Sequence, residues 1–312
     1  MKLWKYVAGS AAVLALLGVY AFPQEYSGGQ GQAVITVLPK NGAPSPDSLT
    51  QGLSLKVNGK DVKVTDLREL QNSPVELVIL IDGSARTNFA QQLRDIAQFV
   101  KSLPPNVRTA VAYMQNGTTR FAGAFTADHN AVLQGLRVPA GLPGSNGSPY
   151  ICLSDLATHW PSQDRAARRE VIMITDGFDE YNPRYDPEDP YLQAALHDSI
   201  RAHLVVYSIY WRDLGRIDRT RYADDAGQNL LQQLTDTTGG KNYWIGLGNP
   251  VSFQPYLEDL AKRLQNQYEL SFTAQLKGKA EIQSLKLKLN TPGTKVDAPQ
   301  QVYVAPPSVA QE

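Results

Sequence analysis

The amino-acid sequence predicts an α/β fold: a doubly wound, mostly parallel six-stranded sheet with helices on both faces, plus a small antiparallel β subdomain from N- and C-terminal segments. From residue 75 onward, continuous apolar runs such as VELVILI alternate with segments whose apolar residues have helical spacing. A continuous apolar run indicates a strand covered on both faces, and alternation of strands with helices indicates a parallel sheet. Before and after this region, short runs alternate polar with apolar residues, which is typical of antiparallel strands.

Composition places the chain among globular proteins and excludes several function classes. Of 312 residues, 42% are hydrophobic and 19% are charged, which is an ordinary globular composition. Lys plus Arg equals Asp plus Glu at 30 each, so the sequence predicts no nucleic-acid-binding surface. The single cysteine, Cys152, excludes an internal disulfide and a cysteine-based zinc site, and its apolar neighbours indicate a core position.

The first residues have the pattern of an export signal. MKLWK supplies two lysines, residues 6–22 carry no charge, and Val19 and Ala21 occupy the small-residue positions of a cleavage site. We therefore predict a signal peptide over residues 1–21 and a periplasmic or secreted protein. An uncleaved N-terminal anchor is the alternative, and it would be the only membrane contact.

The rest of the chain divides by pattern into one inserted domain and two flanking β regions. LSLKV and DVKV flank Asn-Gly-Lys, which predicts a hairpin. The strictly alternating LKLKL near the C-terminus predicts a strand that pairs with this N-terminal hairpin. We predict a flexible leader (22–33), an N-terminal β segment without helix (34–73), the α/β domain (74–267), C-terminal strands (268–305) and a tail (306–312).

Polar side chains follow the apolar strands at the points where those strands end. Asp82 and Ser84 follow the first strand, Asp176 follows VIMIT, and Ser148 lies in a Gly-rich loop before a helix predicted from Tyr150 to about residue 168. In an open parallel sheet, ligands collect at the carboxyl ends of the strands. Two carboxylates and two hydroxyls are hard oxygen ligands suited to Mg²⁺ or a similar cation, whose open coordination position would accept a partner's carboxylate.

Three motifs in order, VILIDGSAR, NGSPYICLSDL and VIMITDGFDE, resemble the von Willebrand factor type A (VWFA) domain and its metal-ion-dependent adhesion site. The likeness is greatest to the exported VWFA-related group found in acidobacteria. It covers residues 75–267 in motif order and 34–305 in organisation. It implies a non-enzymatic protein-binding or cell-adhesion function and a site for Mg²⁺, Mn²⁺ or Ca²⁺ formed by Asp82, Ser84, Ser148 and Asp176.

One position departs from the family pattern: Arg86 stands where the family has a serine ligand. Arginine stays charged and has only hydrogen-bond donors, so it cannot coordinate a cation. Two outcomes remain open. Arg86 pairs with Asp82 or Asp176 and replaces the cation, in which case it would itself bind the partner's carboxylate. Alternatively, its side chain points to solvent, and the other ligands with water hold the cation.

Two further segments near the strand ends contain candidate partner-binding residues. Residues 179–191, beginning with Asp179, hold five acids and three prolines and form either a partner-facing or a simply solvated loop. Residues 210–227 place Trp211 and Arg212 beside further arginines and aspartates. This second segment is either a recognition surface or a loop whose arginines pair with those aspartates.

The predicted function is an adhesion module that engages another protein through that protein's acidic side chain. A metal-dependent hydrolase in the same acidic cleft is one alternative, although the sequence has no G-x-S-x-G elbow, phosphate loop or G-x-G-x-x-G motif. The four histidines also lack metal-binding spacing. A structural envelope protein with a vestigial site is the other alternative.

Overall fold

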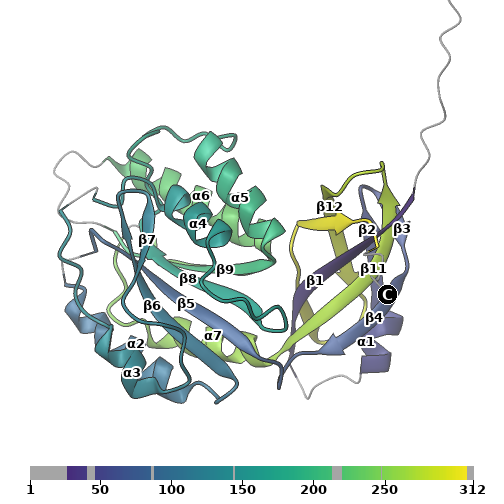
Figure 1. Ribbon diagram of the computed structural model, residues 1–312, viewed down its shortest axis with the longest axis horizontal. Helices are drawn as coiled ribbons and strands as arrows, with labels where there is room; N and C mark the ends of the chain where they lie inside the picture. The colour runs from purple at the N-terminus through teal and green to yellow at the C-terminus, as the bar shows by residue number, and fades with distance from the viewer. Residues whose placement is uncertain are drawn as a thin grey trace, which may run out of the picture.

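The structure is a computed structural model that describes residues 27–40, 46–85, 88–142, 145–212, 220–246 and 248–307. Two modules lie side by side: an α/β domain and an antiparallel β module built from both ends of the described chain (Figure 1). In these ranges, no helix combines the length and the hydropathy that crossing a membrane requires.

Within the described residues, six strands form the sheet of the α/β domain, and this confirms the predicted fold class. Every neighbouring pair is parallel except β6 and β7, which form an antiparallel hairpin at one edge. In spatial order the strands are β10 (Asn242–Tyr243), β9 (Leu204–Tyr210), β8 (Arg168–Thr175), β5 (Val75–Asp82), β6 (Val107–Gln115) and β7 (Thr118–Phe121).

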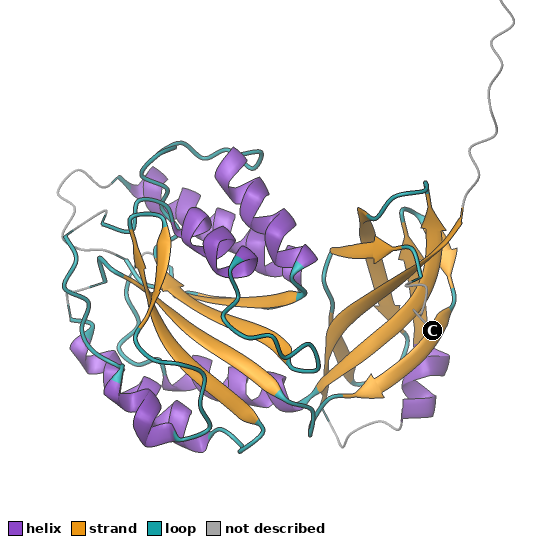
Figure 2. Cartoon of the chain, viewed as in Figure 1, coloured by secondary structure: helices purple, strands orange, loops and turns teal. Residues whose placement is uncertain are grey.

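Helices cover both faces of this sheet (Figure 2). All of β5 is buried: Leu77 and Ile79 belong to the hydrophobic cluster on one face, whereas Val78 and Leu80 belong to the cluster on the other. The first face is covered by α2 (Ala90–Ser102), α3 (His129–Gln134) and α7 (Gln254–Gln265). The second face is covered by α4 (Pro149–Thr158), α5 (Pro190–Arg201) and α6 (Arg221–Thr238).

The second module is an antiparallel sheet of eight strands in the described ranges, drawn from both sides of the α/β domain as the sequence predicts. Asn58 and Gly59, both with positive φ, form the predicted hairpin turn between β2 and β3. Its strands are β1 (Ser27–Pro39), β2 (Leu53–Val57), β3 (Lys60–Val62), β4 (Val64–Glu69), β11 (Gln267–Leu276), β12 (Glu281–Leu289), β13 (Thr294–Asp297) and β14 (Gln301–Ala305).

Three expectations from the sequence are corrected. Residues 27–33 of the predicted flexible leader belong to β1, which pairs with β11 over its first ten residues. The N-terminal segment contains a short helix, α1 (Pro46–Gly52). Helix α4 ends at Thr158 rather than near residue 168, because His159 leaves the helical conformation and Pro161 cannot continue a helix.

The two modules are joined by hydrogen bonds around Arg168 at the start of β8. Its guanidinium donates to the carbonyl oxygens of Leu70 and Leu264, at 2.6 and 2.7 Å. The side chain also forms an ion pair with Glu170, whose carboxylate lies 3.4 Å away and is fully buried. Burial raises the pKa of Glu170 to about 7, although the charge of Arg168 opposes this shift.

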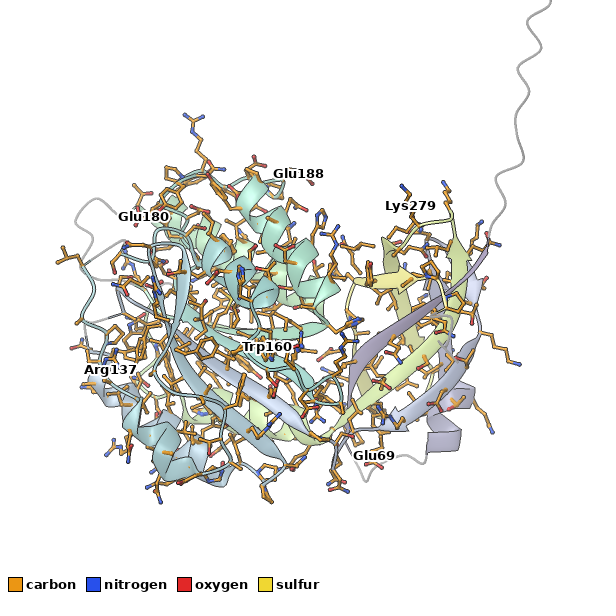
Figure 3. The ribbon with its side chains drawn as sticks, in the orientation of Figure 1. Glu69, Arg137, Trp160, Glu180, Glu188 and Lys279 are labelled. Atoms are coloured by element: carbon orange, nitrogen blue, oxygen red, sulfur yellow. The ribbon has the colours of Figure 1, made fainter. Side chains whose placement is uncertain are left out.

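Glu170 should therefore make the stability of the protein depend on pH. Between its ordinary pKa of 4.5 and about 7, the folded chain keeps a proton that the unfolded chain releases. Stability consequently falls as pH rises through this window, by at most about 3 kcal/mol. We expect Glu170→Gln to remove this component, measured as the difference in urea-unfolding free energy between variant and natural protein at several pH values. The matched control is Glu188→Gln at an exposed loop position labelled in Figure 3, and equal pH profiles for the Glu170 variant and the natural protein would contradict the assignment.

Candidate functional site at the carboxyl ends of the strands

The carboxylate of Asp82, at the end of β5, joins three segments of the predicted site. One oxygen accepts from the backbone N–H and the hydroxyl of Ser84, at 2.9 and 2.6 Å. The other accepts from the amide of Asn146 at 2.8 Å and the hydroxyl of Thr175 at 2.7 Å. A carboxylate offers about four lone-pair positions, and all four are used here. The side chain therefore fixes the relative positions of the loops after β5 and before α4 and the end of β8.

The surroundings of the same carboxylate disfavour its charged form. Only 2% of Asp82 is exposed, and Asp176, which follows β8, is 3% exposed. Burial first, and then the charge of Asp176, raise the pKa of Asp82 to about 6, although the hydrogen bonds from Ser84 and Thr175 oppose this shift. Two buried acids at one sheet edge create the local excess of negative charge that a cation would offset.

Ser148 connects the loop before α4 to the loop after β8. It caps α4, because its side chain accepts from the backbone N–H of Ile151, and its hydroxyl donates to Asp179 at 2.6 Å. Asp179 also accepts from the backbone N–H groups of Tyr181 and Asn182. Burial raises the pKa of Asp179, and the bond from Ser148 opposes the rise. Ser148 is therefore paired within the protein in the present arrangement.

Two glycines allow the loop after β8 to lie directly on helix α6. Gly177 has a positive φ of 67°, and a Cβ there would come within 2.5 Å of the carbonyl oxygen of Gly227. A Cβ on Gly227 would in turn collide with the carbonyl oxygen of Asp176. Backbone therefore packs on backbone at this point, and the position of Asp176 depends on both glycines.

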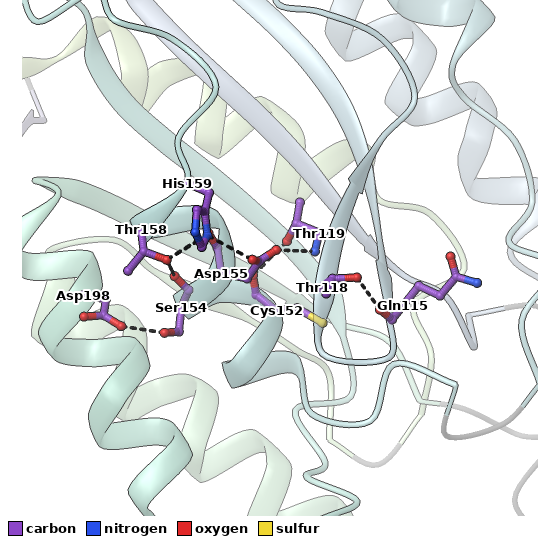
Figure 4. A network of polar contacts seen from close by, with 9 residues as sticks. All are labelled: Gln115, Thr118, Thr119, Cys152, Ser154, Asp155, Thr158, His159 and Asp198. Carbon is purple, nitrogen blue, oxygen red and sulfur yellow. Dashed lines mark hydrogen bonds and ion pairs between the residues drawn. The ribbon is translucent and has the colours of Figure 1, made fainter.

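Hydrogen bonds along helix α4 fix its position relative to β7 and α5 (Figure 4). The carboxylate of Asp155 accepts from the backbone N–H of Thr119 in β7 at 2.8 Å, and the hydroxyl of Ser154 donates to Asp198 in α5 at 2.5 Å. Cys152 is fully buried as the sequence predicts, and burial raises the pKa of its thiol to about 12. These contacts place the N-terminus of α4, and with it Ser148, beside Asp179.

The structure does not bring every predicted site residue to this face. Trp211 is a core residue, 3% exposed, whose ring packs edge-on against Phe89 and Phe253, so the prediction that it contacts a partner is wrong. Arg212 forms an ion pair with the buried Asp224 at 3.0 Å, which favours the pairing alternative for that segment. Arg86 lies outside the described residues.

Sequence reasoning missed Asn146 and Thr175, although both lie inside the quoted motifs, because neither is a metal ligand in the family pattern. Four exposed tyrosines form what is here called the tyrosine surface: Tyr181, Tyr185, Tyr191 and Tyr222, with exposed fractions of 57%, 41%, 37% and 57%. Sequence reasoning included Tyr222 in the candidate recognition segment 210–227 but did not single out the other three. The hydroxyl of Tyr181 lies against Gly147, next to Ser148. The hydroxyl of Tyr222 accepts from the backbone N–H of Tyr185 at 3.0 Å. The spacing of three of these tyrosines within residues 179–191 was the available signal.

The oxygens at this edge suit a hard divalent cation in their chemistry. The protons of the Ser84 and Ser148 hydroxyls are directed to carboxylates, which leaves lone pairs on both oxygens. The buried hydroxyl of Ser145 has no hydrogen-bond partner in the described part of the chain. No cluster of three or more His, Cys, Asp or Glu side chains among the described residues could hold a metal, so such a site would depend on hydroxyl ligands.

Comparisons with known proteins give similarity of structure only. No protein-family model matches the chain, and no curated protein matches it either. BatB from Bacteroides thetaiotaomicron aligns at 15% identity over 61% of this chain and 97% of its own, with a TM-score of 0.42. The VWA domain of SpRpn10 aligns at 13% identity over 60% and 93%, with a TM-score of 0.40. The ArnB paralog VWA2 from Sulfolobus acidocaldarius aligns at 10% identity over 88% and 76%, with a TM-score of 0.39. At these identities the likenesses concern the fold alone, and the strand order described above defines that fold independently.

Asp82→Asn should destabilise the protein, because the new NH2 group must face donors in either orientation: the N–H and hydroxyl of Ser84, or the groups of Asn146 and Thr175. We expect a loss of about 1–3 kcal/mol in the free energy of unfolding, measured by urea denaturation. The control is Asp66→Asn at an exposed position of β4, for which a change within about 0.5 kcal/mol is expected. An Asp82 variant as stable as this control would show that the four hydrogen bonds do not hold the loops.

Proposed function

We propose that this chain is a non-enzymatic, VWFA-like protein-binding module whose partner docks on the face formed by the carboxyl ends of the parallel strands. The observation that carries the proposal is the convergence of three loops on Asp82 and Asp179, which fixes this face before any partner arrives. A face whose groups are already ordered loses little conformational entropy on binding. The likeness to the exported acidobacterial group remains a prediction from the motifs, as does the export signal, because residues 1–21 lie outside the described ranges.

The tyrosine surface supplies the second argument for a protein partner. Tyrosine is enriched at protein interfaces, because its ring buries a large area with few rotatable bonds and its hydroxyl stays hydrogen-bonded. Tyr181 and Tyr191 lie 6.0 Å apart between ring centroids, and Tyr181 lies beside the Ser148 loop. A partner that reaches the acidic site would therefore bury these rings at the same time.

The proposed contact with the partner's acidic side chain requires a positive charge at the site, because Asp82, Asp176 and Asp179 would otherwise repel it. We propose that Mg²⁺, or Mn²⁺ or Ca²⁺ in its place, supplies this charge. Ser84, Ser148 and Asp176 would hold the cation, with Asp82 orienting Ser84. Bound there, the cation would supply an electrophilic position for the partner's carboxylate.

Among the described residues, the contacts of the two serines do not favour the hydrolase alternative. The hydroxyls of Ser84 and Ser148 donate to Asp82 and Asp179, and both carboxylates also accept backbone N–H groups. Each carboxylate accepts several hydrogen bonds that hold the loops together, so an ordering role accounts for these contacts without a catalytic one.

Calorimetric titration with Mg²⁺, Mn²⁺ and Ca²⁺ tests the proposed cation. We expect the natural protein to bind at least one of these ions, and Asp176→Ala to weaken binding by about tenfold or more. Asp186→Ala, which removes a charge from an exposed position of the same loop, is the control and should change affinity little. If only an Arg86→Ser variant binds, the cation proposal fails and Arg86 becomes the contact for the partner's carboxylate.

Site-specific photo-crosslinking tests the docking face in cells that produce the protein. With benzoylphenylalanine at Tyr181, we expect one dominant protein adduct that Asp176→Ala removes. The same cross-linker at Lys279, which lies on the β module far from this face (Figure 3), should not give that adduct. Identical adducts from both positions, or an adduct insensitive to Asp176→Ala, would contradict the proposal.

A further inference from the structure

A second potential binding site lies at the opposite end of the parallel strands, between the two modules. A cleft of about 420 Å³ opens where β8 and β9 begin and where β1 and β14 of the β module approach them. Its volume is within the range of small-molecule sites. Along β8, about 20 Å of strand separates it from the Asp82 site, so the two do not overlap.

The charged residues that line this cleft are strongly unbalanced. Among the described residues they comprise one carboxylate, Glu269, and the arginines at positions 68, 165, 168, 169 and 201. This imbalance is local, because the whole chain has equal numbers of basic and acidic residues. The fold therefore concentrates positive charge in the lining of this cleft.

Two of these arginines are already used by the structure. Arg68 forms an ion pair with Glu269 at 2.9 Å, which cancels the one acid among the described residues of the lining. Arg168 donates to two backbone carbonyls and pairs with Glu170, so its guanidinium is already used in the contact between the two modules. Arg201 reaches Asp198 only at 3.8 Å and remains largely exposed.

Arg165 and Arg169 are the two remaining arginines of the lining. Within the described ranges, neither guanidinium forms an ion pair with a carboxylate. Burial lowers the pKa of Arg169; the charge of the buried Glu76 opposes this shift, and the charge of Arg165 adds to it. Both arginines line the same cleft, Arg165 from an exposed position, and an anion stabilises like charges that lie in one cleft.

Arg169 is also held in position before any ligand binds. Its guanidinium lies over the ring of Trp160, 5.4 Å from the ring centroid. The ring is itself fixed, because its indole N–H donates to Glu76 at 2.7 Å. On the other side of the cleft, His203 packs edge-on against Tyr303 of β14, with 6.5 Å between ring centroids.

From this geometry we infer that the cleft between the modules is a binding site for a small phosphate-bearing anion, held mainly by Arg165 and Arg169. A guanidinium matches a phosphate with two parallel hydrogen bonds, and a pair of arginines suits a group with more than one negative charge. Arg201 would contact the anion from the rim. Because both modules line the cleft, the ligand would also strengthen their contact.

Inorganic pyrophosphate is the probe for this site, titrated calorimetrically into the full chain at low ionic strength. We expect saturable binding that Arg165→Gln/Arg169→Gln weakens by about tenfold or more. Arg169→Lys, which keeps the charge but loses the planar fork, should give an intermediate loss. Arg120→Gln, at an exposed position of β7, removes a positive charge elsewhere and should leave the affinity unchanged.

A second measurement uses the natural chain and so does not depend on how well a variant folds. Phenylglyoxal modifies accessible arginines, and mass spectrometry gives the rate at each position. Pyrophosphate should slow modification of Arg165 and Arg169 by about threefold or more and leave Arg120 unaffected, because bidentate contacts cover the reactive nitrogens.

Three results would overturn the inference. They are the absence of saturable pyrophosphate binding, equal weakening by the double variant and by Arg120→Gln, and equal protection of Arg120 in the labelling experiment. If pyrophosphate does not bind, a parallel titration with citrate identifies the error. Citrate also carries several negative charges, but on carboxylates, so its binding would overturn the assignment of the cleft to phosphate.

Discussion

The pairing of β1 with β11 is the constraint on which the rest of the molecule depends. It joins the beginning of the described chain to the strand that leaves the α/β domain, in continuous register from Ser27 with Leu276 to Thr36 with Gln267. The β module therefore forms only when both ends of the chain have arrived, and the α/β domain lies between them as an insertion. Closing so long a loop is entropically costly, and the burial of Ala33, Ile35 and Val37 of β1 in the core of the β module offsets that cost.

This closure also creates the junction between the modules. Arg168 binds carbonyl oxygens of Leu70 and Leu264, the segments that enter and leave the α/β domain, so one side chain ties the two crossings together. Next to it, α5 packs against β14, and the arginine-lined cleft opens beside that contact. The cleft is thus a consequence of the discontinuous topology, because neither module contains it alone.

Strand β8 contributes residues to both sites, from its two ends. At its carboxyl end, Thr175 donates to Asp82 and so belongs to the acidic face, where burial and like charge are offset by hydrogen bonds. At its amino end, Arg169 faces the cleft, where the excess charge is positive. Between these ends, residues 171–174 are apolar and buried, which keeps the two sites apart and at a fixed separation. Opposite charge at opposite strand ends explains how a chain with no net charge can present two strongly charged sites.

Local pattern was sufficient to predict what depends on local physics. The apolar run of β5 indicated burial on both faces, the Asn58–Gly59 turn indicated a hairpin, and the strand ends at Asp82 and Asp176 placed the acidic edge. These features follow from backbone sterics and from the periodicity of the side chains, which are fixed within a few residues.

Only the tertiary structure decided the features that depend on distant neighbours. Gly31 resembled part of a flexible leader, yet the ring of Phe272 occupies the space where its Cβ would lie, so the glycine permits packing within a strand. Trp211 resembled a surface anchor, yet Phe89 and Phe253 enclose it. Arg165 and Arg169 are close in the sequence, but β1 and β14, which line the cleft opposite them, come from the two ends of the described chain. The sequence alone therefore determined most elements and the acidic edge, because these depend on local patterns, whereas the packing of Gly31 and Trp211 and the walls of the second site depend on residues far apart in the chain.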